Sequence, residues 1–232
     1  MRFAGQTVVV LGGTAGIGLE TARRARAEGA DVILAARNPD RLDAVARALG
    51  ARPVAFDVTD LDRLFAELCD PVDHVLLTGP GPYYAPLADL DAAAARADVE
   101  AHLLVPIMIA KHARDRVRGS LVFMGGTGGR RVSPGLALIG ALTAALPALT
   151  RALALEAAPV RVNLIAAGFV DTPLSAALLG DQLEARRRQL RETLPIGRVI
   201  GPGDVAALAL HLMENTALTG GTYDIDGGQQ LV

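Results

Sequence analysis

The amino-acid sequence predicts an α/β protein with a doubly wound, mostly parallel sheet of about seven strands and helices on both faces. One observation behind this prediction is the alternation of short apolar runs with longer helical stretches along all 232 residues. Another is the stretch TVVVLGGTAGIG at 7–18, where an apolar, β-branched run is followed at once by a glycine cluster. The length and a hydrophobic share of 51% fit one domain, residues 1–232, with a large core.

The first part of the chain predicts a strand–helix–strand crossover followed by a second helix and strand. A helix at 39–50 is expected to begin with Pro39 and to end at Gly50, because proline suits the first helical position and glycine the position after the last. The elements expected before and after it are a strand at 8–11, a helix at 19–28, and strands at 31–36 and 52–56.

The rest of the chain continues this alternation. We expect Thr59 and Asp62 to cap the next helix, and Pro147 to kink or break a long Ala/Leu-rich helix. A polar helical stretch follows residue 173, and we interpret its arginines as a solvated face. The remaining expected elements are strands at 72–78, 120–124, 160–165 and 222–226, and helices at 91–117, 134–158 and 204–215.

Composition limits the classes of partner. The net charge is -2, so no basic field would attract nucleic acid or an anionic membrane. The single cysteine, Cys69, cannot form an intramolecular disulfide and suits a reducing compartment. The N-terminus lacks the pattern of a signal peptide, and no stretch reaches the ~18–20 uninterrupted apolar residues of a membrane span. We therefore expect a cytoplasmic protein that binds a small-molecule substrate but no nucleic acid, membrane or metal.

The glycines at the start of the first helix predict a dinucleotide-binding site. Gly12, Gly16 and Gly18 lie between a predicted strand and a predicted helix, where backbone N–H groups can approach a pyrophosphate at the helix N-terminus. A purely structural glycine turn is the alternative interpretation of this pattern.

The residues after the second and third strands indicate which dinucleotide is bound. Ala36 cannot hold a ribose diol, whereas Arg37 can bind a phosphate through two parallel hydrogen bonds, so NADP(H) is favoured over NAD(H). Arg37 could also be a solvated loop charge. Asp57, followed by Val58, lies at the end of a strand where it could accept a hydrogen bond from the adenine amino group.

These landmarks together resemble the short-chain dehydrogenase/reductase family. The matching pieces are the glycine motif of 12–18, Asp57-Val58, the strand of 75–78, GFVDTP at 168–173 and DGG at 226–228. The resemblance implies a Rossmann-type fold, a substrate-side helical insertion at about 172–195, and a nicotinamide cofactor. The cofactor-binding residues it implies are Gly12, Thr14, Gly16, Ile17, Gly18, Arg37, Asp57, Val58, Thr78, Gly79, Gly168, Val170 and Thr172.

The family's catalytic residues are absent from this sequence. The family uses a serine, a tyrosine and lysine four residues apart, and an asparagine; Gly126, Ile139, Thr143 and His102 stand at those positions. This loss does not depend on the alignment. Lys111 is the only lysine, and no tyrosine precedes a lysine by four residues anywhere in the chain.

Two functions therefore stay open. The first is an NADP(H)-dependent oxidoreductase with a different proton donor, for which His102, Tyr83 and Tyr84 are candidates because the family places their segments beside the nicotinamide. Packing, pocket lining or subunit contact are the alternative roles of these three residues. The second is a cofactor-binding protein that serves as a sensor, a partner subunit or a non-redox catalyst.

Two further expectations concern the residues around the fifth strand and the next helix. Thr127 and Arg130 could replace the missing serine as oxyanion donors. The family also pairs through the helix that follows, which here carries small residues, so we expect a homodimer or homotetramer; these small residues are Gly140, Ala141, Ala144 and Ala145.

Overall fold

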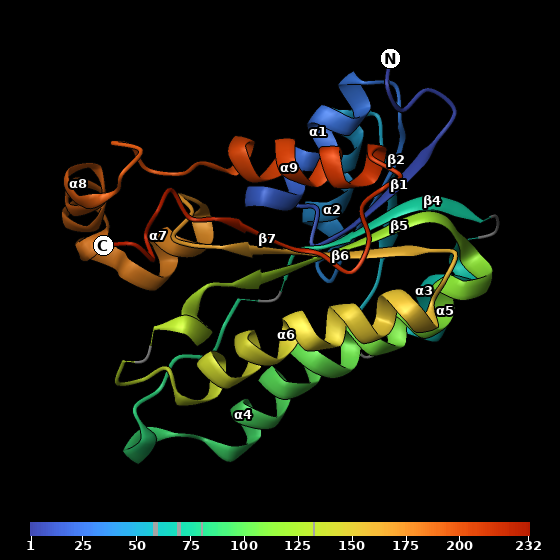
Figure 1. Ribbon diagram of the computed structural model, residues 1–232. Helices are drawn as coiled ribbons and strands as arrows, with labels where there is room; N and C mark the ends of the chain where they lie inside the picture. Colours follow the sequence, from blue (N-terminus) through green and yellow to red (C-terminus); the bar gives the residue numbers. More distant parts are fainter. Residues whose placement is uncertain (58–59, 69–70, 80, 132) are drawn as a thin grey trace.

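The computed structural model describes residues 1–57, 60–68, 71–79, 81–131 and 133–232, which are built around a seven-stranded sheet (Figure 1). Neighbouring strands pair in parallel in the order β3-β2-β1-β4-β5-β6-β7, which confirms the predicted fold. The order reverses between β1 and β4, and ligands bind outside the carboxyl ends of the strands at such a point. The strands are β1 (Thr7–Leu11), β2 (Asp31–Ala36), β3 (Arg52–Ala55), β4 (Val72–Leu77), β5 (Val117–Gly126), β6 (Arg161–Ala167) and β7 (Thr222–Ile225).

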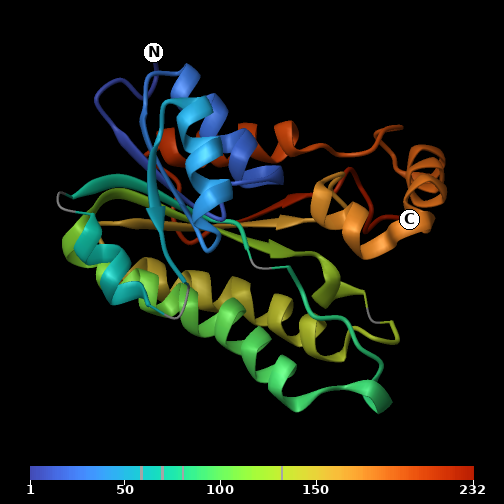
Figure 2. The same cartoon turned by 180° about the vertical axis from the view of Figure 1, so that it is seen from behind.

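Helices cover both faces of this sheet (Figures 1 and 2). One face carries α1 (Gly16–Ala27), α2 (Pro39–Leu49) and α9 (Pro202–Glu214). The opposite face carries α3 (Leu61–Glu67), α4 (Ala92–Val99), α5 (Val105–Arg116) and α6 (Ala137–Glu156). The helical stretch expected at about 172–195 consists of α7 (Pro173–Leu179) and α8 (Leu183–Thr193), which lie beyond the carboxyl ends of the strands (Figure 1).

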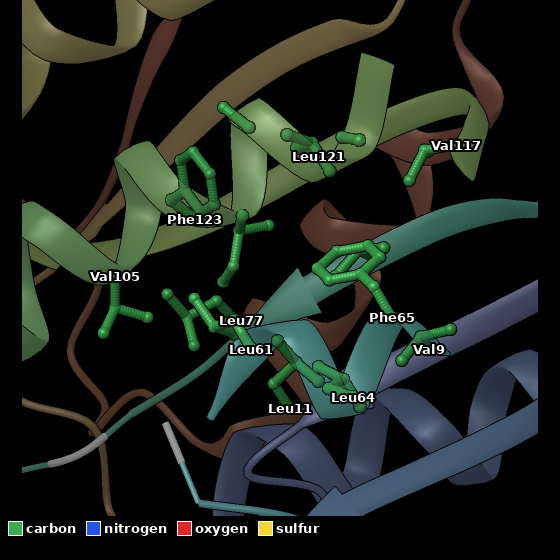
Figure 3. Packing of buried hydrophobic residues seen from close by; sticks show 14 of the residues in the cluster. Val9, Leu11, Leu61, Leu64, Phe65, Leu77, Val105, Val117, Leu121 and Phe123 are labelled. Carbon is green, nitrogen blue, oxygen red and sulfur yellow. The ribbon is translucent and has the colours of Figure 1, made fainter. Parts of the chain in front are cut away.

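Strand β1 separates two hydrophobic cores. Val8 and Val10 belong to the core under α1 and α9, whereas Val9 and Leu11 belong to the core under α3 and α5. Successive side chains of a strand point to opposite faces, so a buried parallel strand reads as a continuous apolar run. Figure 3 shows the second core, where Phe65 packs among the side chains of neighbouring strands.

Local caps mark the starts of α2 and α3, among other helices. Asn38 precedes Pro39 and accepts a hydrogen bond from the backbone N–H of Arg41 at 2.9 Å, and Gly50 ends the same helix with a φ of 65°, as predicted. At α3 the cap is Asp60, whose Oδ1 accepts from the N–H of Arg63 at 3.2 Å. Thr59 of the expected Thr59–Asp62 pair lies outside the described residues.

The long helical region predicted at 91–117 is interrupted by a π-helical turn. Residues Glu100–Leu104 form this π turn between α4 and α5, and the N–H of Val105 donates to the carbonyl of Glu100. The next residue, Pro106, has no N–H and could not donate a helical hydrogen bond in either register. The change of register at this point therefore loses no hydrogen bond from Pro106. The region also ends earlier than predicted, because β5 begins at Val117.

Pro147 is expected from the sequence to kink or break helix α6; the helix runs through Pro147 without a break, so a break is excluded. Leu146 and Leu153 are both buried in the core on either side of the proline, and this packing holds the helix across the missing N–H. Among the described helices α6 is the one long and apolar enough to cross a membrane. The core helices of soluble proteins meet the same criterion, and α6 packs on β5 and β6.

His74 is a buried polar residue of β4, at the end of the sheet opposite the ligand-binding edge. Its side chain is held between the Ser120 hydroxyl, 2.9 Å from Nδ1, and the side-chain carbonyl of Gln6, 3.1 Å from Nε2. A neutral ring with its proton on Nε2 satisfies both partners. Burial lowers the pKa of His74 from 6.5 to about 4.

This pKa shift predicts a pH-dependent stability. The unfolded chain takes up a proton near pH 6.5 and the folded chain only near pH 4, so stability is lost as pH falls through this window, by about 3 kcal/mol in all. Urea unfolding measured from pH 7 to 4 should show this loss. It should be much smaller in His74→Gln and unchanged in the exposed control His211→Gln. An equal slope in wild type and His74→Gln would contradict the assignment.

Candidate functional site

The glycine loop after β1 admits no side chain at two of its positions. A Cβ on Gly18 would lie 2.5 Å from the carbonyl oxygen of Gly12, and Gly12 itself has a φ of 91°. Helix α1 therefore begins almost in contact with the end of β1. The residue before it, Ala15, has no side-chain oxygen, so the first N–H groups of α1 are left for a ligand. A cradle of this kind fits the pyrophosphate of a dinucleotide.

Thr78 fastens the end of β4 to this glycine loop. Its hydroxyl lies 3.0 Å from the carbonyl oxygen of Leu11 and 3.3 Å from that of Gly12, and its N–H also donates to Leu11. A Cβ on Gly12 would lie 2.5 Å from the Thr78 hydroxyl, so the Thr78 hydroxyl can occupy this place only because residue 12 is a glycine. Thr78 thus positions the loop. Gly79 makes no such contact, since a Cβ added to it would have no neighbouring atom within 4 Å.

The segment after β6 reaches the same loop from the other side. Gly168 is packed so tightly that a Cβ there would lie 2.7 Å from the Cβ of Asp226. Val170 is buried and forms a bridge with Ile200, and Thr172 caps α7 through a capping box with Ser175. The side chain of Thr172 lies 3.5 Å from the point that a Cβ on Gly16 would occupy, so the start of α7 is next to the glycine loop.

The residues expected at the adenosine end lie at the carboxyl ends of β2 and β3. Arg37 is exposed directly after β2, and Asp57 is exposed after β3; Val58 lies outside the described residues. Sequence reasoning missed Arg41, whose guanidinium donates to the carbonyl of Thr14 in the glycine loop at 3.3 Å. The available signal was its place in the first turn of the predicted helix that follows Arg37.

The positions of the family's serine, tyrosine and lysine carry no replacement acid or cation. Ile139 is buried on α6, and the hydroxyl of Thr143 donates to the carbonyls of Ile139 and Gly140 of its own helix at 2.8 and 3.1 Å. A side chain at Gly126 would only touch Thr143, since the nearest contact is 3.5 Å. These three residues are brought together but cannot donate a proton to a substrate.

Arg130, one of the two suggested oxyanion donors, is held by other side chains of the protein. Arg130 forms a bidentate ion pair with Asp224, including a contact of 2.7 Å from Nη2 to Oδ1. Thr127 is buried, and its N–H donates to the carbonyl of Ala167. The turn Gly128–Arg130 packs directly on α6, where a Cβ on Gly129 would lie 2.7 Å from backbone atoms of that helix. Arg130 is therefore engaged within the protein, while the role expected for the Thr127 hydroxyl stays a prediction.

His102 lies on the π turn beside a buried carboxylate, Asp98. The Nδ1 atom of His102 is 3.0 Å from the backbone carbonyl of Asp98 and 3.1 Å from its Oδ1. Both side chains are enclosed, with 14% of His102 and 4% of Asp98 exposed. Sequence reasoning missed Asp98, although its spacing of four residues places it on the same helix face as His102.

Both candidate tyrosines also lie near Asp98. The N–H of Tyr83 donates to Asp98 Oδ1 at 3.3 Å, while the Tyr83 hydroxyl accepts from the N–H of Asp91 at 3.0 Å. Tyr84 is half-exposed, and its pKa is raised by burial of the ring and by the negative charge of Asp98. A raised pKa makes Tyr84 a weaker proton donor. Within the described residues, no group of three His, Cys, Asp or Glu side chains could hold a metal ion.

Comparisons with known proteins agree with this geometry. The sequence model of the family described as "Enoyl-(Acyl carrier protein) reductase" matches residues 12–230. A relative from Stachybotrys chlorohalonatus, "Short-chain dehydrogenase/reductase ATR9", is 29% identical over 97% of this chain and 96% of its own.

Two solved structures share the fold over nearly their whole length. The "MalC Reductase/Diels-Alderase" of Malbranchea aurantiaca has a TM-score of 0.90 and 25% identity, covering 100% of this chain and 98% of its own. A "small-chain dehydrogenase in complex with NADPH" has a TM-score of 0.83 and 28% identity, and the match covers 98% of this chain and 99% of the dehydrogenase chain.

Proposed function

Because the chain belongs to the short-chain dehydrogenase/reductase family of oxidoreductases, we propose that it is an NADP(H)-dependent enzyme acting on a carbonyl/alcohol pair with a non-standard proton donor. The glycine cradle between β1 and α1, which a Cβ on Gly18 would fill, carries this proposal. When bound, the nicotinamide cofactor supplies or accepts the hydride. We further propose a small-molecule substrate and a cytoplasmic location, which the single cysteine supports.

The chain's own residues divide the task of binding. The N–H groups at the start of α1 would hold the pyrophosphate, and Thr172 would close the site from the side of α7. Arg37 and Arg41 would hold the phosphate that distinguishes NADP(H), because both lie beside the adenosine end of the glycine loop. That one structural neighbour is an NADPH complex supports this choice.

A preference for NADP+ over NAD+ should depend on Arg37. We expect Arg37→Ala to weaken NADP+ binding by about 10- to 100-fold, since charge-assisted hydrogen bonds contribute roughly 1.5–3 kcal/mol, and to leave NAD+ binding unchanged. Calorimetric titration of both cofactors measures this. The exposed Arg47→Ala on the last turn of α2 serves as the control. Equal affinities in the wild type, or a preference that survives Arg37→Ala, would refute the assignment.

The missing acid should make ordinary reductions slow. Losing a positioned proton donor costs ~10²- to 10⁴-fold, and losing an oxyanion donor ~10²- to 10³-fold. We therefore expect reduction of simple ketones at least some hundredfold slower than by a relative that has the tyrosine and lysine, assayed side by side by NADPH absorbance. Turnover at the usual ~1 to 10³ s⁻¹ of enzymes would show that our interpretation of the site is wrong.

A second candidate is a cofactor-binding protein without redox turnover. One structural neighbour is named both a reductase and a Diels–Alderase, and the second of these reactions moves no hydride. A non-redox catalyst, a sensor or a partner subunit would need the cradle but not the acid. NADPH binding without turnover on any aldehyde, ketone or imine of a broad panel would favour this candidate over the first.

We also propose that two or four copies assemble through α5 and α6. Apolar side chains are exposed on both helices and on the π turn before α5, among them Leu104 of the π turn, Met108 and Leu155, the last of which is 82% exposed. Ala141 is exposed between them, whereas Gly140 and Ala144 partly pack on the Gly128–Arg130 turn of the same chain. A second copy of this surface would bury these side chains.

The assembly is expected to depend on small side chains. Light scattering at micromolar concentration should give the mass of a dimer or tetramer, and Ala141→Arg should give a monomer, because a long charged side chain would separate the helices. The control Ala44→Arg on the exposed side of α2 should leave the mass unchanged. A monomeric wild type contradicts the proposal.

A further inference from the structure

We propose that His102 and Asp98 act as a pair, in which Nε2 of His102 exchanges the proton with the substrate oxygen and Asp98 holds the ring in place. His102 is then a catalytic residue and Asp98 a positioning residue. The inference rests on the proposed oxidoreductase function and selects one donor from the three candidates.

The hydrogen bonds of Nδ1 determine where the ring carries its proton. Nδ1 of His102 faces two oxygens, the backbone carbonyl of Asp98 and its carboxylate, at 3.0 and 3.1 Å. Both are acceptors, so Nδ1 must be the donor and the neutral ring must leave its lone pair on Nε2. Among the described residues none is hydrogen-bonded to Nε2. This is the arrangement in which an acid orients a histidine for proton transfer at its other nitrogen.

The pair lies at the ligand-binding edge of the sheet. One turn after His102, Val105 packs in the core with Leu77 and Phe123 from β4 and β5 (Figure 3). Helix α4, which carries Asp98, continues beyond the carboxyl ends of the strands and runs beside α6 in both views (Figures 1 and 2). The π turn contacts α6. The π turn that carries His102 therefore lies at the same end of the sheet as Gly126 and the start of α6.

One carboxylate oxygen of Asp98, the buried Oδ2 atom, has no hydrogen-bond donor among the described residues. A buried carboxylate oxygen without a donor is costly, and a protonated His102 beside it would offset part of that cost. The loop after β4 adds Tyr83 and Tyr84 as the titratable groups that face the pair. Residues 133–150, which lead into and form the first turns of α6, contain no titratable side chain.

The two tyrosines are less suited to the role. The Tyr83 hydroxyl accepts a hydrogen bond from the N–H of Asp91 and so lies at the start of α4, at the other end of this helix from His102. Tyr84 is half-exposed, and its pKa is raised, which opposes proton donation. In the reductive direction, protonated His102 gives its Nε2 proton to the carbonyl oxygen while the carbonyl carbon takes the hydride of NADPH. The carbon–oxygen π pair becomes the O–H bond, the hydride pair becomes the C–H bond, and neutral His102 and NADP+ remain.

Nitrogen NMR of the histidine rings tests the placement without any substrate. The chain has four histidines, and the signals that disappear in His102→Gln belong to His102. We expect the neutral ring to carry its proton on Nδ1, and saturating NADP+ to shift the Nε2 signal. Asp98→Asn should raise the share of the Nε2–H form. His211→Gln, on the exposed face of α9, should leave the His102 signals unchanged. A proton on Nε2 in the wild type, or an Nε2 signal that NADP+ does not move, overturns the proposal.

Kinetics test the role with the best substrate of the panel. His102→Gln should lower kcat about 10²-fold or more with little change in KM, and should abolish the fall in reduction rate with rising pH that a protonated imidazole imposes. Asp98→Asn should also lower kcat. The affinity for NADP+ reports whether the His102 and Asp98 variants are folded.

His102→Asn, which restores the family's residue, should be as slow as His102→Gln. An unchanged kcat and pH profile in both His102 variants overturns this inference while leaving the oxidoreductase proposal standing. Absence of turnover in the wild type instead counts against the proposed function, and the NMR result then decides the pair.

Discussion

The close approach of α1 to the end of β1 is the constraint on which the rest of the site depends. Gly18 reaches the carbonyl of Gly12 at a distance that excludes any Cβ, and the Thr78 hydroxyl closes the same point from β4. Because the strand order reverses between β1 and β4, this junction lies at the ligand-binding edge of the sheet. The segment that ends at Thr172 and the helix that begins with Pro39 are placed around it.

The fold and this junction could be predicted from the sequence because their signals are local. The run of Val8–Leu11 enters two cores by simple alternation, and the limits of α2 follow from Asn38, Pro39 and Gly50. Interactions between distant segments were not predictable in this way. The π turn depends on a register change before Pro106, and α6 continues through Pro147 because Leu146 and Leu153, before and after the proline, are packed in the core.

The same distinction explains what was missed in the candidate site. His102 was selected because the sequence resemblance places it at the family's asparagine position, but nothing in the pattern indicated that Asp98 is buried against it. The exclusion of Arg130 needs its partner Asp224, which lies on β7, far along the chain. Sequence reasoning therefore identified positions, whereas the structure was needed to decide which side chains are still available for chemistry.

Cofactor binding in the cradle depends on the backbone, whereas proton transfer depends on side chains, and this separation explains how binding can persist when the proton donor changes. The cradle consists of backbone N–H groups and of glycines that must remain small, so replacement of side chains elsewhere leaves it intact. The family's acid, in contrast, depends on side chains, and Ile139 and Thr143 now turn that part of α6 into a packed surface. The proposed new donor belongs to a different element, the π turn after α4, where His102 is paired with Asp98.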